Sequence, residues 1–283
     1  MSSFSNHKVD VASGTPDGPS VVECDVGGSV RIGGGVTLAA LAAHPDIRER
    51  FAVVATACEQ TGEPAAGTPT LTSHLSQRPQ CPVFRRNVSC HKNGGHSCPA
   101  HDGENATLAI LEGGPCWSVH PSDVAVALVA VDAMIEVDGP SGPRSVGAAY
   151  FFVLPAHRMD REIALGNSER IVAVLLPAEA AGGLQRFTKL TQPDALPAAF
   201  VSLAVTRRAD GDVRLVLGGV SPRPYRIYNS VEEEAMSGGL DEETIADLAE
   251  RALLDAEPLS QNGYKVELAA LLLRDAIRLI AEG

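Results

Sequence analysis

Short apolar segments of two kinds follow one another along this chain. Runs rich in Val, Ile and Leu that alternate with polar residues and end at Gly, Pro, Asn or Asp are typical of β-strands. The predicted strands lie at 20–24, 29–32, 134–137, 144–146, 171–176, 184–190, 199–207 and 213–218. Apolar spacings of three and four residues predict helices at 37–44, 45–58, 121–132 and 241–256, and a closing helix from about 264. This mixture predicts an α+β fold.

The composition of successive segments divides the chain into parts. Residues 1–28 are rich in Gly, Ser, Pro and Asp and predict a flexible N-terminal segment that contains the strand at 20–24. A polar stretch at 157–168 predicts a linker between a first domain at 29–160 and a second α+β domain at 168–283. The length of 283 residues suffices for two small domains.

Charge and hydropathy exclude several classes of protein. The net charge of −12 argues against a nucleic-acid-binding protein. No apolar run approaches the roughly 20 residues of a membrane-spanning helix, so no membrane association is expected. The first residues, MSSFSNHKVDVASG, lack the apolar region of a signal peptide, which predicts a cytoplasmic protein. The sequence also has no P-loop, Ser-His-Asp motif or zinc-protease signature.

The stretch at 77–117 combines thiols, cations and glycines. It holds four of the six cysteines, namely Cys81, Cys90, Cys98 and Cys116. Nearby cationic or titratable side chains are Arg78, Arg85, Arg86, His91, Lys92, His96 and His101. Such a segment cannot build an apolar core of its own, but thiolates that converge on a metal centre would hold it in place.

The spacing of these cysteines leaves the kind of centre open. The gaps of eight, seven and seventeen residues lack the tight cysteine pairs of structural zinc sites and the ferredoxin run. Soft thiolates select zinc or iron–sulfur clusters, and a larger cluster reached from separate loops suits such gaps better. The residues therefore favour an iron–sulfur cluster. Zinc is one alternative, and disulfides or unliganded thiols are the other, although a reducing cytosol argues against disulfides.

The same stretch carries a family resemblance. The segments QRPQC, FRRNVSCHKNGG, CPAHDGEN and GGPCWSVHPSDVAVAL resemble the FAD-binding medium subunit of molybdenum hydroxylases, and LGGVSPRPYRI and NGYKV extend the resemblance toward the C-terminus. The closest branch is the aldehyde oxidoreductase and 4-hydroxybenzoyl-CoA reductase type within the wider xanthine dehydrogenase group. That resemblance implies a [4Fe-4S] cluster on the four cysteines of the 77–117 loop. It also implies a PCMH-like FAD-binding domain followed by a C-terminal α+β domain of the CO dehydrogenase flavoprotein type.

Two departures from the family pattern concern the flavin. Residues 1–28 do not match the N-terminal subdomain whose glycine turn wraps the FAD pyrophosphate, so the FAD-binding domain is expected to be truncated. The family also has Arg-Asn and Gly-Gly-Asn where this chain has Ala66-Gly67 and Thr72-Ser73-His74. Side chains in place of the glycines should block the backbone's approach to the flavin or force a strained conformation. Tight FAD binding in the family manner is therefore not expected.

Five further residues are candidates for the site. His74 is a candidate acid, base or ligand that faces the vacated flavin space, and the alternative is a histidine of the turn or the surface. Ser122 and Asp123 are candidate remnants of the flavin site, with helix capping as the alternative. Tyr264 and Lys265 are candidate cofactor-facing residues. Their alternative roles are packing for Tyr264 and solvation for Lys265.

These observations favour an oxidoreductase component in which the cluster transfers electrons and the FAD site is degenerate. Its expected partners are molybdopterin and [2Fe-2S] subunits or another redox protein. A first alternative is a stand-alone enzyme of specialised metabolism that binds a small molecule in the vacated flavin cleft, with a structural cluster. A second alternative is a non-catalytic scaffold subunit. The sequence specifies neither the substrate nor the oligomeric state.

Overall fold

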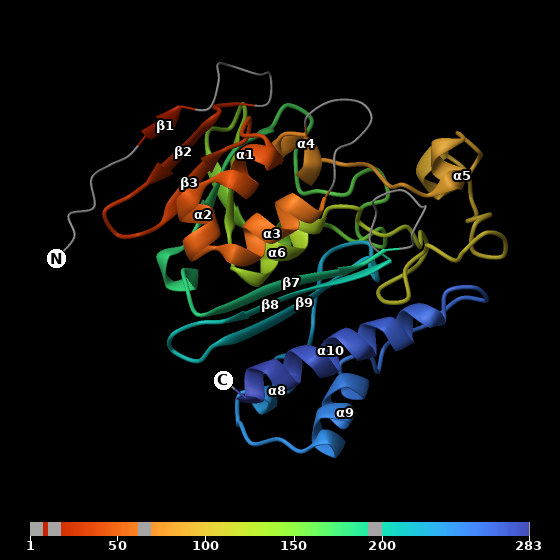
Figure 1. Ribbon diagram of the computed structural model, residues 1–283. Coiled ribbons are helices and arrows are strands. Elements are labelled where there is room, and N and C mark those ends of the chain that lie inside the picture. The colour runs from red at the N-terminus through yellow and green to blue at the C-terminus, as the bar shows by residue number, and fades with distance from the viewer. Residues whose placement is uncertain (1–7, 11–17, 62–68, 192–199, 283) are drawn as a thin grey trace.

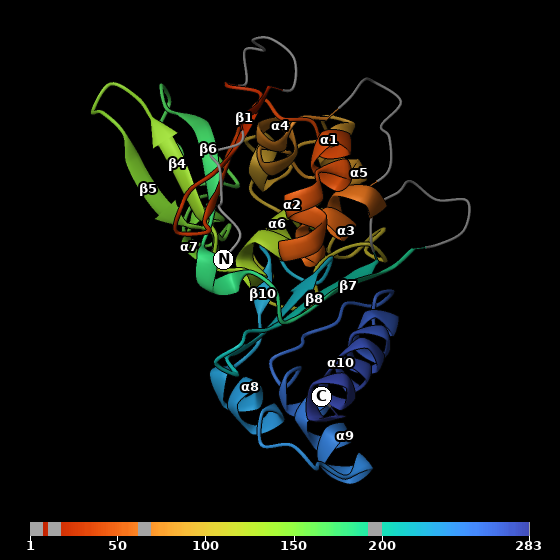
Figure 2. The same ribbon diagram turned by 60° about the vertical axis from the view of Figure 1, so that its left-hand side comes forward.

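The computed structural model describes residues 8–10, 18–61, 69–191 and 200–282. A first sheet, a group of helices, a second sheet and a further group of helices follow one another in space (Figures 1 and 2). A lobe of loops that contains the short helix α5 (Pro82–Arg85) extends from one side of this stack (Figure 1). In the described parts of the chain, no helix is long and apolar enough to cross a membrane.

The first sheet is antiparallel, with six strands in the order β1-β2-β3-β6-β4-β5. Its strands are β1 (Lys8–Asp10), β2 (Val21–Cys24), β3 (Val30–Gly33), β4 (Met134–Asp138), β5 (Arg144–Gly147) and β6 (Arg170–Leu176). At the end of β3 the chain passes so close to Pro19 that a Cβ on Gly33 would lie 2.1 Å from the Pro19 carbonyl oxygen. Glycine is therefore required at this point.

Helices and this sheet share the larger hydrophobic core. The helices are α1 (Leu38–Ala43), α2 (Pro45–Arg50), α3 (Ala52–Gln60), α4 (Leu71–Leu75), α6 (Asp123–Ala130) and α7 (Ala148–Phe151). Thr37 caps α1, at the start of the helix predicted over 37–44, because its Oγ1 accepts a hydrogen bond from the Ala40 amide at 3.2 Å. Every residue of α6 is buried, since this helix contacts α3 on one side and β8 and β9 on the other.

The second sheet is also antiparallel and has the order β10-β9-β8-β7. Its strands are β7 (Leu184–Leu190), β8 (Val201–Arg207), β9 (Val213–Gly218) and β10 (Tyr225–Arg226). Side chains of β8 alternate between two cores: Ala204 belongs to the core around α6, whereas Leu203 and Val205 belong to the smaller core. That second core is completed by α8 (Asn229–Ala235), α9 (Glu242–Arg251) and α10 (Tyr264–Glu282), which lie beyond the second sheet in Figure 2.

The α+β prediction is confirmed, but the structure corrects several details. We expected the strand at 171–176 to open the second domain, whereas β6 pairs with β3 and β4 in the middle of the first sheet. The polar stretch before β6 is therefore a connection within the first sheet, which polarity alone could not distinguish from a linker. The N-terminal segment contributes β1 and β2 to the same sheet, so its ordered part exceeds the one predicted strand. Residues 1–7 and 11–17 lie outside the described residues.

Two helical predictions also differ from the structure. The helix expected at 45–58 is divided into α2 and α3 at Phe51, whose φ of −131° and ψ of 51° are not helical. Three consecutive glutamates, 232–234, predict a solvated helix face, but Glu232 is buried. Its carboxylate accepts hydrogen bonds from Arg226 and from the Leu215 amide, because α8 packs against the end of the sheet. Hydrophobic spacing predicts which face of a helix is apolar, and it does not detect a buried charge that has a partner.

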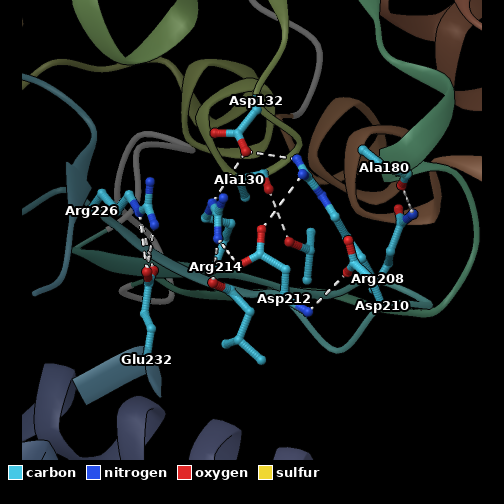
Figure 3. Close-up of polar contacts among 12 residues, drawn as sticks. Ala130, Asp132, Ala180, Arg208, Asp210, Asp212, Arg214, Arg226 and Glu232 are labelled. Atoms are coloured by element: carbon cyan, nitrogen blue, oxygen red, sulfur yellow. Dashed lines mark hydrogen bonds and ion pairs between the residues drawn. The ribbon is translucent and has the colours of Figure 1, made fainter. Parts of the chain in front are cut away.

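A polar cluster joins the two halves of the molecule beside α6 (Figure 3). We call Asp132, Arg208, Asp212 and Arg214 the Asp132 junction. The Asp132 carboxylate accepts hydrogen bonds from Arg208 Nη2 at 2.6 Å and from Arg214 Nε at 3.1 Å. Both arginines also pair with Asp212. The junction therefore ties the end of α6 to the β8–β9 hairpin through charges that the protein itself supplies.

Candidate metal centre

The four cysteines of the 77–117 loop line one pocket. Cys81 precedes α5, and Cys90 precedes the short 3-10 helix η1 (His91–Asn93). Cys98 lies in the turns that follow, and Cys116 arrives after the glycine pair at Gly113 and Gly114. Phe84, Leu108 and Lys92 complete part of the wall. The structure thus brings together the four residues that the sequence selected.

Backbone amide groups are directed at two of the sulfur atoms. The backbone N–H groups of Val83 and Phe84 lie near the Cys81 sulfur, and those of Ala100, His101 and Trp117 lie near the Cys98 sulfur. Burial raises the pKa of both thiols, and nearby cysteines raise it further, whereas these amides lower it because they stabilise the thiolate. Such donors are of the kind that tunes thiolate-bound metal centres.

The thiols are neither paired with one another nor arranged around a single ion. All six cysteines are free thiols. Among the described residues no group of three or more His, Cys, Asp or Glu side chains is placed to hold one metal ion. Zinc requires all its sulfur ligands at about 2.3 Å from one point. The pocket therefore combines four thiols around a shared space with a spacing that does not match a closed single-ion site.

The C-terminal segment holds the part of the 77–117 loop, from here on called the thiol loop, that lies between Cys98 and Cys116. Asn105 is fully buried, and its side chain hydrogen-bonds Ser260 and the Gln261 amide. The Lys265 ammonium group donates to the carbonyl oxygens of Thr107, Leu108 and Gly219 at 2.7 to 3.0 Å, and burial lowers its pKa to about 7.

The two C-terminal candidates therefore both contact backbone carbonyl groups. The Tyr264 hydroxyl donates to the Ala106 carbonyl at 2.8 Å, close to the carbonyls that Lys265 binds. This geometry favours the anchoring of the thiol loop as the task of Tyr264 and Lys265. It also differs from the solvated alternative for Lys265, whose side chain is 1% exposed.

A second anchor lies in the wall of the pocket itself. Lys92 donates to Glu162 Oε1 at 2.7 Å and to the Met159 carbonyl at 3.2 Å. The other carboxylate oxygen of Glu162 lies 2.8 Å from Arg78 Nε. The side chains of Lys92 and Glu162 are only 2% and 8% exposed. The loop is thus joined to the segment before β6 by a buried ion pair.

His74 lies inside the protein instead of facing an open cleft. It is 3% exposed, and its Nδ1 lies 2.7 Å from the Ser122 hydroxyl. Ser122 Oγ also accepts a hydrogen bond from the Ala125 amide, which leaves its proton for a neutral imidazole at His74. Burial and the nearby Lys189 lower the pKa of His74 to about 4. This environment favours a packed, neutral histidine over a solvent-facing acid or base.

His120 and Asp123 extend this buried polar group. His120 Nδ1 accepts a hydrogen bond from the Ser122 amide, and burial, together with His74, lowers its pKa to about 3. The Asp123 carboxylate forms an ion pair with Lys189 at 2.7 Å, and burial raises its pKa while Lys189 opposes that change. Ser122 is the N-cap of α6, so it combines capping with the contact to His74.

Sequence reasoning missed three residues that the structure places at these sites. Lys92 was noted only as one of several cations in the loop, and Glu162 lies in a segment that looked like a linker. His120 was seen as part of the HPSD motif without a role of its own. A lysine two residues after a cysteine was the available signal for Lys92. No local pattern marks Glu162 as its partner, because 70 residues separate the two.

Comparison with known proteins gives a consistent family. Residues 20–179 match the model of the FAD binding domain in molybdopterin dehydrogenase. The chain is 33% identical over 264 residues to the aldehyde oxidoreductase FAD-binding subunit PaoB of Escherichia coli, covering 90% of this chain and 80% of that protein. It is 26% identical over 178 residues to the glyceraldehyde dehydrogenase medium chain of Sulfolobus acidocaldarius, covering 60% of each.

Solved structures share the fold. A chain of the carbon monoxide dehydrogenase from Hydrogenophaga pseudoflava superposes with a TM-score of 0.61 at 21% identity, covering 92% of this chain and 77% of that chain. A chain of quinoline 2-oxidoreductase from Pseudomonas putida 86 gives a TM-score of 0.58 at 18% identity, covering 93% and 78%. At these identities the likeness establishes the architecture, including the placement of the two sheets and their helices.

Proposed function

The chain belongs to the family of FAD-binding domains in molybdopterin dehydrogenases, and from this premise we propose that it is an electron-transferring component of a molybdenum-hydroxylase type of oxidoreductase. In this proposal Cys81, Cys90, Cys98 and Cys116 bind a [4Fe-4S] cluster. Their convergence on one pocket is the observation that carries the proposal.

The donor set of the pocket suits an iron–sulfur cluster. Four thiolates would supply every protein ligand that such a cluster needs, and the cluster would then accept and release single electrons. The amides directed at Cys81 and Cys98 would stabilise the thiolates. Lys92 would place a positive charge in the wall of a pocket that collects negative charge. Zinc suits the arrangement less well, because the described thiols do not converge at single-ion distances.

The family also implies FAD, and one turn of this chain fits it poorly. Thr72, Ser73 and His74 lie in α4, where the Thr70 and Ser73 side chains each bond the other's backbone amide. The turn is helical and unstrained, so the strain that we considered does not occur. Instead His74 fills the interior beside Ser122. We infer that this turn does not hold FAD in the family manner. Ala66-Gly67 lies outside the described residues.

The contact that His74 makes supports the electron-transfer proposal over the stand-alone enzyme hypothesis. The stand-alone enzyme hypothesis used His74 as its only named catalytic group, and that group is buried and paired. His74 therefore gives no support to catalysis in a vacated flavin cleft. The electron-transfer proposal does not depend on that cleft. It expects molybdopterin and [2Fe-2S] subunits, or another redox protein, as partners.

The test is anaerobic purification followed by an absorption spectrum and assays of iron, sulfide, zinc and released flavin on one sample. About four irons and four sulfides per chain are expected, because four cysteine thiolates hold one [4Fe-4S] cluster. Zinc without sulfide would overturn the cluster. Stoichiometric FAD would overturn the inference about the turn at 72–74 and leave the cluster proposal intact.

A pair of cysteine variants makes this test specific. Cys98→Ser should lose the cluster because it removes one of the four thiols that line the pocket. Cys24→Ser is the matched control, since Cys24 is a free thiol on β2 and does not line the pocket. Equal loss of iron in both variants would contradict the assignment. Co-purification with larger redox subunits tests the proposed partners separately.

A further inference from the structure

Lys92 carries a buried charge whose effect on a bound cluster the proposed function does not specify. We propose that Lys92 is a positioning residue that fixes one positive charge beside the four-thiol pocket and thereby raises the reduction potential of whatever cluster is bound there. Glu162 holds the ammonium group in place. This inference rests on the proposed function, because it concerns the same pocket.

The side chain of Lys92 forms part of the pocket wall, and its ammonium group is held in a fixed place next to that wall. Lys92 lines the pocket together with the four cysteines. Its side chain is 2% exposed, and its Nζ is held by Glu162 Oε1 at 2.7 Å and by the Met159 carbonyl at 3.2 Å. A lysine on the surface would instead move freely and be screened by solvent and salt.

The carboxylate that holds Lys92 is itself fixed. The backbone carbonyl of Glu162 accepts a hydrogen bond from the Val153 amide at 3.0 Å, and the next residue, Ile163, forms a β-bridge with Phe152. The side chain of Glu162 therefore starts from a defined backbone position. The short ion pair with Glu162 then fixes the position of the Lys92 ammonium group.

The local charges leave a net positive excess. Glu162 is shared by Lys92 and Arg78, so two cations and one anion give a net charge of +1. Arg78 is 47% exposed, and solvent screens it more than Lys92. A buried ion pair often contributes little to stability compared with an apolar replacement, because desolvation of both charges is costly. An electrostatic role gives a reason for a charge in this wall that a purely structural contact does not.

The direction of the effect follows from the charge. Reduction of a cluster adds one negative charge, and a nearby fixed positive charge stabilises that state. Removal of the Lys92 charge should therefore lower the reduction potential, whereas neutralisation of Glu162 should raise it. A merely structural clamp predicts a different result, because both changes break the same contact and would alter the pocket in the same sense.

The experiment is a redox titration of the purified protein, followed by cluster absorption and electron paramagnetic resonance. For Lys92→Met we expect the ratio of reduced to oxidised cluster at a fixed potential to fall about tenfold, which is about 59 mV for one electron. Glu162→Gln should shift the ratio in the opposite direction. Lys92→Arg keeps the charge and should stay near the parent value. Arg78→Met is the matched control at the same carboxylate and should shift the ratio less than Lys92→Met.

The outcomes separate this inference from the proposed function. Shifts of the same sign in Lys92→Met and Glu162→Gln, or no shift in either, would overturn the electrostatic role while the parent protein still held its cluster. If Lys92→Met loses iron, the sign of the shift in Glu162→Gln decides the question. A parent protein without iron and sulfide would overturn the proposed function and this inference with it.

Discussion

The thiol pocket and the Asp132 junction both join distant parts of the chain through polar side chains, but they satisfy those groups differently. At the junction each charge meets an opposite charge, since Asp132 and Asp212 are both paired with Arg208 and Arg214 (Figure 3). In the pocket, four groups of the same kind face one another as free thiols. The charges of the junction therefore compensate one another, whereas the thiols of the pocket are all groups of one kind.

This difference separates a structural contact from a candidate binding site. At the junction the charged groups already pair with one another and need no ligand from outside the protein. The pocket instead gathers four thiols, which are soft ligands of the kind that bind zinc or iron–sulfur clusters. The resemblance of the 77–117 segment to medium subunits of molybdenum hydroxylases concerns the same four cysteines, and their role as cluster ligands stays a proposal.

The largest expected effect that tests this contrast comes from removal of the proposed metal centre. If the four cysteines hold such a centre, chelation of the purified protein should leave the thiol loop without its ligand. We expect the amides of Val83, Phe84 and Trp117, which are directed at sulfur, to exchange hydrogen at least roughly tenfold faster. Site-resolved hydrogen exchange measures this change.

The Asp132 junction supplies the internal control for that measurement. The amides of Val131, Asp132 and Ala133 bond the carbonyls of α6, and their exchange should not change when the metal is removed. Faster exchange at both places would show that the junction also depends on the ligand. The contrast between the two regions would then be wrong.

The second effect concerns His74 and His120, two buried histidines whose Nδ1 atoms make hydrogen bonds within the protein. Their pKa values are lowered to about 4 and about 3, below the ordinary 6.5 of the unfolded chain. Between pH 6.5 and about 4 the unfolded chain thus binds more protons than the folded chain. Stability should be complete above pH 6.5 and fall as the pH is lowered. The slope is up to roughly 1.4 kcal/mol per pH unit for each histidine.

A variant isolates the contribution of one of these histidines. His74→Asn removes one titrating group, so the difference between the unfolding curves of parent and variant should grow with pH between about 4 and 6.5. Asp123, whose raised pKa has the opposite effect near the acid end, is present in both proteins and cancels. Denaturation with urea at several pH values gives the curves. Parallel curves would show that His74 is charged or exposed in the folded protein.

Much of the fold follows from local sequence patterns. The two strands of the β4–β5 hairpin were predicted from their own residues, and the short connection through Asp138 and Gly139 lets them pair as neighbours. The N-caps at Thr37 and Ser122 follow from side chains that bond amides within one turn. The place of β6 could not be predicted in this way. Its partners β3 and β4 are distant along the chain, and a strand pattern does not name its neighbours.

The candidate site shows the same limit. The four cysteines of the pocket could be predicted as metal ligands from the sequence, because cysteine is a soft ligand wherever it lies in the fold. The pairs Lys92–Glu162 and His74–Ser122 were not predicted, since their members are 70 and 48 residues apart. Glu162 in particular lies in a polar stretch, where solvent exposure is the ordinary expectation. Tertiary structure alone brings these groups together.

The third effect is expected at the junction itself. Asp132→Asn removes the charge between Arg208 and Arg214 while it keeps a residue that tolerates the left-handed backbone there, where φ is 52°. Asp132 is about one third exposed, so we expect a loss of about 1–3 kcal/mol, between the values for exposed and buried pairs. Equilibrium unfolding measures it.

A matched surface variant sharpens that result. Asp247→Asn removes an exposed partner of Arg251 on α9 and should cost no more than about 0.5 kcal/mol. A larger loss for Asp247→Asn than for Asp132→Asn would show that the junction is not the stabilising contact that we infer. The loss at Asp132 should also be the same with and without the metal, because the junction needs no outside ligand.

The smallest effect tests the connection between the thiol loop and the C-terminal helix. The Tyr264 hydroxyl donates to the Ala106 carbonyl, in the part of the thiol loop between Cys98 and Cys116, and Tyr264→Phe removes only that hydrogen bond. In the metal-loaded protein we expect a loss of about 0.5–1 kcal/mol, the ordinary net value of such a bond. After metal removal the loss should shrink toward zero, because a loop without its ligand no longer holds Ala106 in place. Denaturation of the parent and of Tyr264→Phe, each with and without the metal, gives the four values needed.

An equal loss in both states would mean that Asn105 and Lys265 hold the part of the loop around Ala106 without the metal. Only the segments that carry the cysteines would then depend on the ligand.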